Sequence, residues 1–254
     1  ALPLLEGDSE IHITTPLQSE DYVKITLDTL KTFDISVVYE NNCFYIRGKQ
    51  VYTVNGEPCV EGDWSNAAFF MTGAAIGGSE IVYTNLRGES LQGDKVVVDI
   101  LRKMGARIDV QGDTYTVLGG KLTATEIDAK PIPDLVPILA FAAAVAEGET
   151  IIKNAERLRV EESDRLKTVY ETLNSLGADI EEKEDGLVIR GREKLKGGIV
   201  SSFNDHRIAM MAAIASIVCE EEVTILQAEA VNKSYPGFYE DFKKLGGKVI
   251  IDEE

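Results

Sequence analysis

The sequence has very few of the residues from which metal sites and disulfide frameworks are built. Its 254 residues include three cysteines, Cys43, Cys59 and Cys219, and two histidines, His12 and His206. The cysteines form no pair at metal-binding spacing, and their odd number and scatter favour a reducing compartment. Two histidines leave little for a zinc site. We therefore expect neither a disulfide framework nor a bound metal.

Long apolar runs are also absent. The longest, residues 135–146, is too short to span a bilayer and is interrupted by Pro137. The first residues lack the basic region of a secretory signal peptide. The sequence therefore predicts no membrane segment and a cytoplasmic location.

Positive charge is scarce. The chain has 26 Lys and Arg against 43 Asp and Glu, which gives a formal net charge of −17. This balance argues against a surface that binds nucleic acid. Hydrophobic residues make up 44% of the chain and charged residues 27%, a globular composition with ample material for one large or two ordinary domains.

A long internal period is the most informative feature that is present. Asp63, Asp134 and Asp205 each open an apolar helical stretch, and the two intervals, 134 − 63 and 205 − 134, are both 71 residues. A fixed period of this kind indicates a repeat architecture. One step before Asp63 would fall ahead of the first residue.

The remainder of each unit follows the same period. A β-branched strand follows each apolar helix, over residues 80–84, 150–152 and 223–226. A second, amphipathic helix comes next, and a residue suited to the left-handed conformation follows its end. Those four residues, including one in an incomplete first copy, are Asp34, Gly105, Gly177 and Gly246.

These patterns predict an α/β protein made of βαβαββ units. Residues 1–55 contain only the second half of a unit, so we expect the chain to be the distal part of a longer protein. Residues 56–254 hold three full units, and residues 55–58 are interpreted as a turn or short linker. The alanine-rich helices should be buried at the centre of three sheets, with the amphipathic helices partly exposed.

If the units are equivalent, their corresponding loops meet at one end, and Asp63, Asp134 and Asp205 come close together. The loops before the second helices, residues 89–94, 160–165 and 232–236, should join them. Helix N-termini favour anions. Cationic side chains that would add to this preference are Arg157, Arg159, Arg165, Arg207 and Lys233.

Simpler roles remain open for each of these residues. The three aspartates could be helix N-caps, and Arg165 could only pair with Glu162 or Asp164. His206 could be a structural hydrogen-bonding group. However, polar clusters on apolar helices are costly to desolvate without partners. Two such clusters, residues 159–165 and 204–210, lie at equivalent points of two units and therefore suggest a shared anionic ligand.

Several motifs together resemble 5-enolpyruvylshikimate-3-phosphate (EPSP) synthases, and they span the whole chain in the family's order. They are residues 61–63 (EGD), 91–94 (LQGD), 132–134 (IPD), 159–165 (RVEESDR), 204–210 (NDHRIAM) and 233–236 (KSYP). The resemblance implies an inside-out α/β barrel, or α–β prism, of the enolpyruvyl transferase type. Residues 1–55 would be the last, truncated unit of the N-terminal domain and 56–254 the C-terminal domain.

The resemblance also implies a reaction. Such an enzyme transfers the carboxyvinyl group of phosphoenolpyruvate to the 5-hydroxyl of shikimate 3-phosphate and releases phosphate, in aromatic amino acid biosynthesis. It implies no metal or organic cofactor. By the match, Asp134 and Glu162 are catalytic, and Arg165, Arg207 and Lys233 bind phosphoenolpyruvate. Ser19, Asp134, Arg157 and Glu161 belong to the shikimate 3-phosphate site.

The sequence departs from the family's pattern in three places. Glu161 stands where the family usually has a lysine that helps to bind shikimate 3-phosphate, and Arg157 stands where asparagine is common. Residues 19–22 lack the usual basic residue and proline. The upstream part, which would carry further catalytic residues, is not in the chain, so we expect the chain to be inactive alone.

Three other interpretations stay open. The chain could be a stable C-terminal fragment without catalytic activity. It could belong to the related transferase that acts on UDP-N-acetylglucosamine, although residues 162–165 and 205–207 argue against this. An RNA-terminal phosphate cyclase is disfavoured by the acidic balance and by these motifs.

Overall fold

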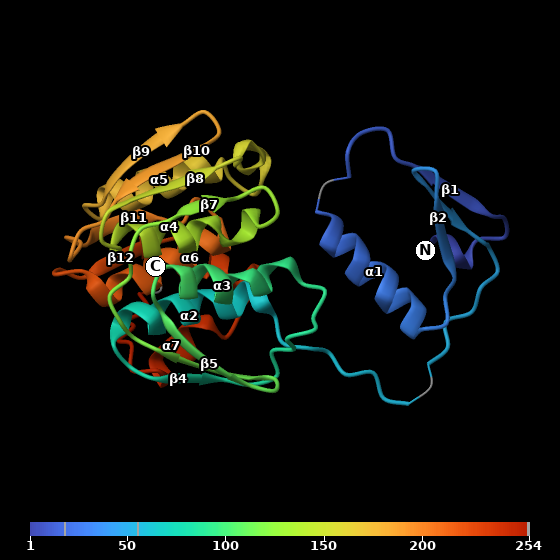
Figure 1. The fold of residues 1–254 in the computed structure, drawn as a ribbon, viewed down its shortest axis with the longest axis horizontal. Coiled ribbons are helices and arrows are strands. Elements are labelled where there is room, and N and C mark those ends of the chain that lie inside the picture. Colours follow the sequence, from blue (N-terminus) through green and yellow to red (C-terminus); the bar gives the residue numbers. More distant parts are fainter. Residues whose placement is uncertain (18, 55, 253–254) are drawn as a thin grey trace. The chain divides into compact units, whose positions relative to one another are not determined.

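The computed structural model describes residues 1–17, 19–54 and 56–252, and contacts divide the chain into two units (Figure 1). One unit contains Ala1–Glu61 and Glu89–Gly93, and the other contains Gly62–Gly88 and Asp94–Glu254. The expected boundary after residue 55 lies shortly before Glu61, the last residue of the segment Ala1–Glu61. The predicted turn includes Asn55, which lies outside the described residues.

The first unit is a small antiparallel sheet with one long helix. Strands β1 (Ser9–His12), β3 (Cys43–Ile46) and β2 (Val37–Glu40) lie side by side in that order. Helix α1 (Glu20–Thr32) is amphipathic, yet none of its described residues is buried. The half unit predicted from the sequence therefore folds as a strand, a helix and a hairpin.

The second unit is built around three buried helices, α2 (Trp64–Gly77), α4 (Val136–Ala144) and α6 (His206–Ala215). Every residue of α4 and of α6 is buried, and each of the three helices packs against the other two. The expected central helices are therefore confirmed. Small residues such as Ala74, Ala143 and Ala213 explain the packing, because they let helix backbones approach closely.

Sheets and amphipathic helices surround these central helices. The three sheets, in strand order, are β4 (Ile81–Tyr83), β6 (Thr114–Leu118) and β5 (Arg107–Gln111); β7 (Glu126–Asp128), β8 (Glu149–Lys153), β10 (Gly186–Arg190) and β9 (Asp179–Lys183); and β11 (Gly198–Ser201) with β12 (Val223–Leu226). The amphipathic helices are α3 (Val97–Lys103), α5 (Arg165–Ser175) and α7 (Phe238–Lys244). Each has a buried apolar side and exposed polar residues. The predicted strands at 80–84, 150–152 and 223–226 are confirmed as β4, β8 and β12.

The predicted residues in the left-handed conformation are also confirmed. The backbone φ angles are 61° at Asp34, 102° at Gly105, 94° at Gly177 and 101° at Gly246. Glycine adopts this conformation without the steric cost that a Cβ atom brings, whereas aspartate tolerates it. The four helix ends therefore have one local geometry, although one of them lacks glycine.

One part of the predicted unit is wrong. Within residues 1–17, 19–54 and 56–252, the full order of strand, helix, strand, helix and two strands occurs only in the middle copy, from β7 to β10. Residues 56–62, before α2, and residues 245–252, after α7, form no strand. Residues 56–60 are exposed, and no β-ladder includes them. An extended segment needs a neighbouring strand to be stable as a strand. Among the described residues, no helix combines the length and the apolar character that a bilayer crossing requires.

Candidate functional site

The site begins where the three central helices start, and these starts are not built alike. Asp63 is the N-cap of α2 and accepts a hydrogen bond from the backbone N–H of Asn66 at 3.1 Å. Asp205 caps α6 and accepts from the backbone N–H of Arg207 at 2.9 Å. Both N-cap interpretations are confirmed. For Asp134 that interpretation is wrong, because Asp134 lies inside the short 3-10 helix Pro133–Leu135 and Leu135 is the N-cap of α4.

The guanidinium of Arg165 lies at the centre of the site. Its side chain is fully buried, and it donates to three carboxylates. Nε donates to Asp205 Oδ2 at 2.8 Å, Nη1 to Asp134 Oδ1 at 2.8 Å, and Nη2 to Glu162 Oε2 at 2.5 Å. The simpler expectation of a single ion pair was therefore too limited, because Arg165 joins three segments of the chain.

The start of α5 fixes the position of this arginine. Asp164 is the N-cap of α5 and accepts from the backbone N–H of Lys167 at 3.2 Å. Arg159 Nη1 in turn donates to Asp164 at 3.1 Å and to Glu182 at 2.6 Å. The segment 159–165 is thus tied to strand β9, and Arg159 acts as a support for the loop.

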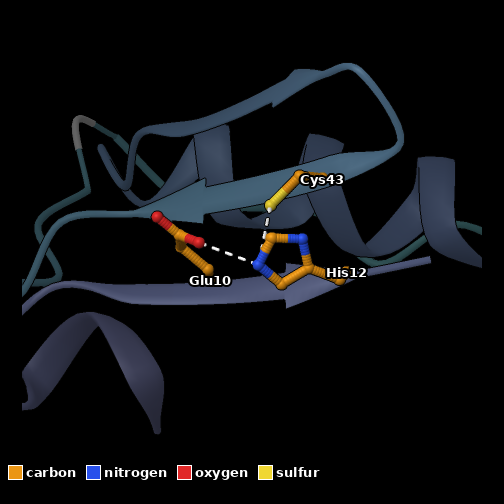
Figure 2. Close-up of side chains that lie close together, drawn as sticks. All are labelled: Glu10, His12 and Cys43. Carbon is orange, nitrogen blue, oxygen red and sulfur yellow. Dashed lines mark hydrogen bonds and ion pairs between the residues drawn. The ribbon is translucent and has the colours of Figure 1, made fainter. Parts of the chain in front are cut away.

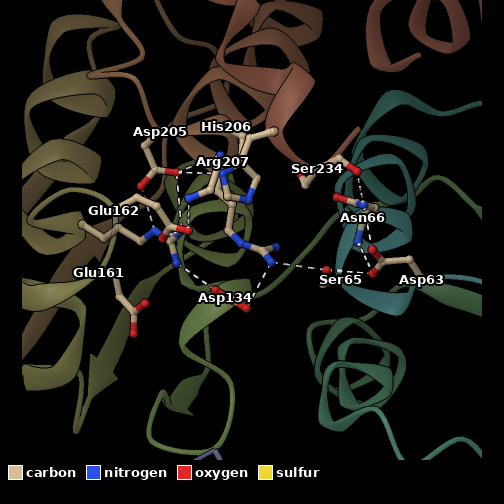
Figure 3. A network of polar contacts seen from close by, with 12 residues as sticks. Asp63, Ser65, Asn66, Asp134, Glu161, Glu162, Asp205, His206, Arg207 and Ser234 are labelled. Atoms are coloured by element: carbon tan, nitrogen blue, oxygen red, sulfur yellow. Dashed lines mark hydrogen bonds and ion pairs between the residues drawn. The ribbon is translucent and has the colours of Figure 1, made fainter. Parts of the chain in front are cut away.

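A second arginine extends the network across the central helices (Figure 3). Arg207 Nη2 lies 3.0 Å from Asp134 Oδ2 and 3.3 Å from Ser65 Oγ. Ser65 Oγ donates to Asp63 Oδ1 at 2.7 Å. A continuous chain of polar contacts therefore links Asp63, Asp134 and Asp205, which confirms the predicted convergence.

The loop before α7 reaches the same network. Lys233 forms an ion pair with Glu162, and the backbone carbonyl of Ser234 accepts from Asn66 Nδ2 at 3.3 Å. Positive and negative groups therefore alternate along the site, in the order Lys233, Glu162, Arg165, Asp134 and Arg207.

The neighbouring opposite charges shift the pKa values of Arg165, Asp205 and Glu162. Burial by itself lowers the pKa of Arg165, but the hydrogen bond and charge of Asp205, with Asp134 and Glu162, outweigh it and raise that pKa. Burial by itself raises the pKa of Asp205 and of Glu162. Arg165 holds the pKa of Asp205 below its usual range, and Lys233 together with Arg165 does the same for Glu162. These groups stay ionised together.

Some buried polar atoms of the site find no acceptor or donor within the described part of the chain. They are Nε and Nη1 of Arg207, Nδ1 of His206 and Oδ1 of Asn66. His206 Nδ1 lies 3.7 Å from Asp205 Oδ1, and burial, helped by the charge of Arg207, lowers the pKa of His206 to about 4. A buried N–H without an acceptor is costly, so an anion that accepted from Arg207 would stabilise the site.

The other predicted residues have mixed outcomes. Arg157 Nε lies 3.1 Å from Glu161 Oε1, so these two residues pair with each other. Ser19 precedes α1 in the first unit, with a left-handed backbone at φ 48°. Residues Glu89–Gly93 also belong to that unit. The predicted place of Ser19 and of this loop beside the other site residues stays a prediction.

Sequence reasoning missed three polar residues of the network. Ser65 and Asn66 link α2 to Arg207 and to the loop before α7, and Ser163 donates to Asp205 Oδ2 at 2.9 Å. The available signal was their position, one to three residues from a carboxylate that had been singled out.

Comparisons with known proteins agree on one family. The model of EPSP synthase (3-phosphoshikimate 1-carboxyvinyltransferase) matches residues 1–242. The 3-phosphoshikimate 1-carboxyvinyltransferase of Clostridium novyi is 53% identical over 99% of this chain, which covers 57% of that relative. That of Clostridium acetobutylicum is 51% identical over 98% of the chain and 58% of the relative. An EPSP synthase structure from Acinetobacter baumannii has a TM-score of 0.77 at 29% identity, over 98% of this chain and 59% of that one.

The first prediction concerns the centre of the network. Replacing Arg165 by methionine leaves the fully buried Asp205 carboxylate without its cation. We expect the free energy of unfolding at neutral pH to fall by about 3–5 kcal/mol, as when one partner of a buried ion pair is removed. Urea unfolding followed by circular dichroism measures this change.

The matched control is the double variant Arg165→Met with Asp205→Asn, which removes the unpaired charge as well. It should recover part of the lost stability. An Arg165→Met protein within 1 kcal/mol of the original would show that the network does not stabilise the fold, and the idea would be abandoned.

The second prediction concerns pH. The pKa of His206 is about 4 in the folded protein, against an ordinary 6.5 when unfolded. As pH falls from about 6.5 to about 4, His206 is protonated in the unfolded chain but stays neutral in the folded chain. The free energy of unfolding therefore falls by up to about 3 kcal/mol. In His206→Gln this loss should be missing. Parallel stability–pH curves for the two proteins would contradict the prediction.

Proposed function

The chain belongs to the EPSP synthase family, and from this we propose that it is part of an enzyme of the shikimate pathway. The enzyme transfers the carboxyvinyl group of phosphoenolpyruvate to the 5-hydroxyl of shikimate 3-phosphate and releases phosphate. The family and its α/β fold, both predicted from the sequence, are confirmed by the comparisons. The chain spans just under three fifths of its curated relatives, so activity, substrates and partners are proposed here for the whole protein.

One observation carries the proposal: the meeting of cations and carboxylates at the helix starts. Arg207, Lys233 and Arg165 lie in one connected network with Asp134 and Glu162. Phosphoenolpyruvate carries a carboxylate and a phosphate, and guanidinium groups bind both well. The buried Nε and Nη1 of Arg207, which lack acceptors within the described residues, support a bound anion at this place.

The carboxylates supply the proton transfers. The 5-hydroxyl oxygen attacks C2 of phosphoenolpyruvate, its proton passes to Asp134, and the methylene carbon takes a proton to become a methyl group. Loss of phosphate and of one methyl proton then restores the double bond in the product. Glu162 exchanges the proton at this carbon, because paired carboxylates suit transfer in both directions.

Substrate charge should prepare Glu162 for this role. Without ligand, Lys233 and Arg165 hold the pKa of Glu162 below its usual range. An anionic substrate that attracts Lys233 removes part of this stabilisation. The pKa of Glu162 then rises toward a value at which it can carry a proton.

The shikimate 3-phosphate side is assigned to Ser19, Arg157 and Glu161, together with Asp134. Glu161 engages Arg157 at 3.1 Å, so its carboxylate competes with the substrate phosphate for that guanidinium. This pair replaces the lysine and asparagine that are usual in the family.

The rest of the enzyme is the proposed partner of the first unit. Helix α1 carries Val23, Leu27 and Leu30 at positions i, i+4 and i+7, yet none of its described residues is buried. An apolar stripe of this kind faces a protein core in ordinary domains. We assign residues 1–55 to the end of the N-terminal domain and 56–254 to the C-terminal domain, in a cytoplasmic enzyme whose reaction needs no cofactor.

A second candidate is a stable fragment without catalysis, which is favoured by the limited share of the relatives that the chain covers. Both proposals predict that the 254-residue chain alone releases no phosphate from phosphoenolpyruvate and shikimate 3-phosphate. They differ when the chain is joined to the upstream part of the Clostridium novyi relative. Only the enzyme proposal expects phosphate release by this joined protein.

The third prediction tests the catalytic assignment in the joined protein. Glu162→Gln should lower kcat by about a hundredfold or more, since a positioned acid or base typically contributes this much. Glu171→Gln, on helix α5 just after the loop that carries Glu162, is the matched control and should leave kcat unchanged. Phosphate release by the isolated chain would overturn the expected inactivity. Equal rates for the two variants would remove Glu162 from the mechanism.

The fourth prediction concerns Glu161. In the joined protein Glu161→Gln removes the carboxylate that competes with the substrate phosphate for Arg157, so the KM for shikimate 3-phosphate should fall about tenfold, equivalent to about 1.4 kcal/mol. The KM for phosphoenolpyruvate should not change. Arg157→Gln should raise the KM for shikimate 3-phosphate. An unchanged KM in both variants would place this pair outside the substrate site.

A further inference from the structure

A second group of reactive side chains lies in the sheet of the first unit. Glu10, His12 and Cys43 come together on strands β1 and β3 (Figure 2). One potential ligand atom from each, a carboxylate oxygen, an imidazole nitrogen and a thiol sulfur, lies within 4.8 Å of the other two.

The register of the sheet brings these residues together. In the antiparallel pairing of β1 with β3, His12 lies directly opposite Cys43, and Glu10 lies opposite Tyr45. Because side chains alternate between the two faces of a strand, Glu10 and His12 share one face. Directly opposed residues point to the same side, so Cys43 joins them there. The three groups are therefore held by two hydrogen-bonded strands.

The distances are close to those of a metal site. His12 Nε2 lies 2.8 Å from Glu10 Oε2 and 4.0 Å from Cys43 Sγ. In a tetrahedral zinc site with bonds of about 2.0 Å to nitrogen or oxygen and about 2.3 Å to sulfur, ligand atoms lie about 3.3–3.6 Å apart. Side-chain movements of well under 1 Å for the two measured pairs would give this geometry.

The exposure of the group allows a metal to enter. The side chains of His12 and Glu10 are 65% and 54% exposed, whereas Cys43 is only 2% exposed. The two exposed side chains can change rotamer without disturbing the core, while the buried one is fixed. Glu40, opposite Cys43 on β2, adds negative charge nearby.

We propose that Glu10, His12 and Cys43 form a binding site for a divalent transition metal of the zinc class, with water as the fourth ligand. A thiolate and an imidazole select such ions over magnesium and calcium, which prefer oxygen ligands. Binding replaces the thiol proton of Cys43 and the contact between Glu10 and His12 with bonds to the metal. The site is independent of the proposed enzyme activity.

Cobalt titration of the purified, reduced 254-residue chain tests the proposal. Co²⁺ bound to a thiolate gives a charge-transfer absorption band, which should saturate at one equivalent and disappear when Zn²⁺ is added. Cys43→Ser should abolish the band. His12→Gln and Glu10→Gln should each weaken binding about tenfold or more, because loss of a ligand costs at least as much as loss of a hydrogen-bonding partner of a ligand.

The other cysteines provide matched controls. Cys59→Ser and Cys219→Ser should keep the band and the affinity of the original chain. If Cys43→Ser fails to fold, as judged by circular dichroism, the cobalt affinity of His12→Gln is the deciding measurement, because His12 is exposed. Absence of the band, its loss in Cys59→Ser, or unchanged affinity in His12→Gln would overturn the proposal. The three residues would then be an ordinary surface contact between Glu10 and His12 beside the buried thiol of Cys43.

Discussion

The buried charge of Arg165 is the constraint on which the site depends. A guanidinium without access to water needs anionic acceptors in fixed positions, since its desolvation is otherwise prohibitive. Asp134, Glu162 and Asp205 supply these acceptors from three segments that are distant in the sequence. Each of these segments lies at or just before the start of a helix in the second unit. The requirement to neutralise one side chain therefore fixes three helix starts relative to one another.

The same constraint explains how a strongly acidic chain could bind anions. The net charge of −17 describes the whole surface, but the site itself alternates between cations and carboxylates. Substrate anions would compete with Asp134 and Glu162 for Arg207, Lys233 and Arg165. Under the proposed function, binding and proton transfer would be coupled in such an arrangement, because each new anion changes the pKa of the neighbouring carboxylates.

In the first unit, strand register determines which side chains come together. Its sheet is antiparallel throughout, and register alone decides which side chains meet on each face. His12 and Cys43 are 31 residues apart, and neither belongs to a motif with metal-binding spacing. Composition suggested that the chain had too few ligands for a metal site. The pairing of β1 with β3 nevertheless places a thiol, an imidazole and a carboxylate together.

The sequence by itself determined the central helices and the four left-handed helix ends, because apolar content and the residue that follows each helix are local properties. The 71-residue period further predicted that the starts of these helices converge. It also carried the motifs that identify the family. Only the tertiary structure decided that Asp134 pairs with two arginines instead of capping a helix, and that Ser65 and Ser163 complete the network. It likewise decided that the described residues 56–62 before α2 and 245–252 after α7 form no strand. Ion pairs and strand ladders depend on partners from distant segments, and a local pattern cannot specify which partner is present.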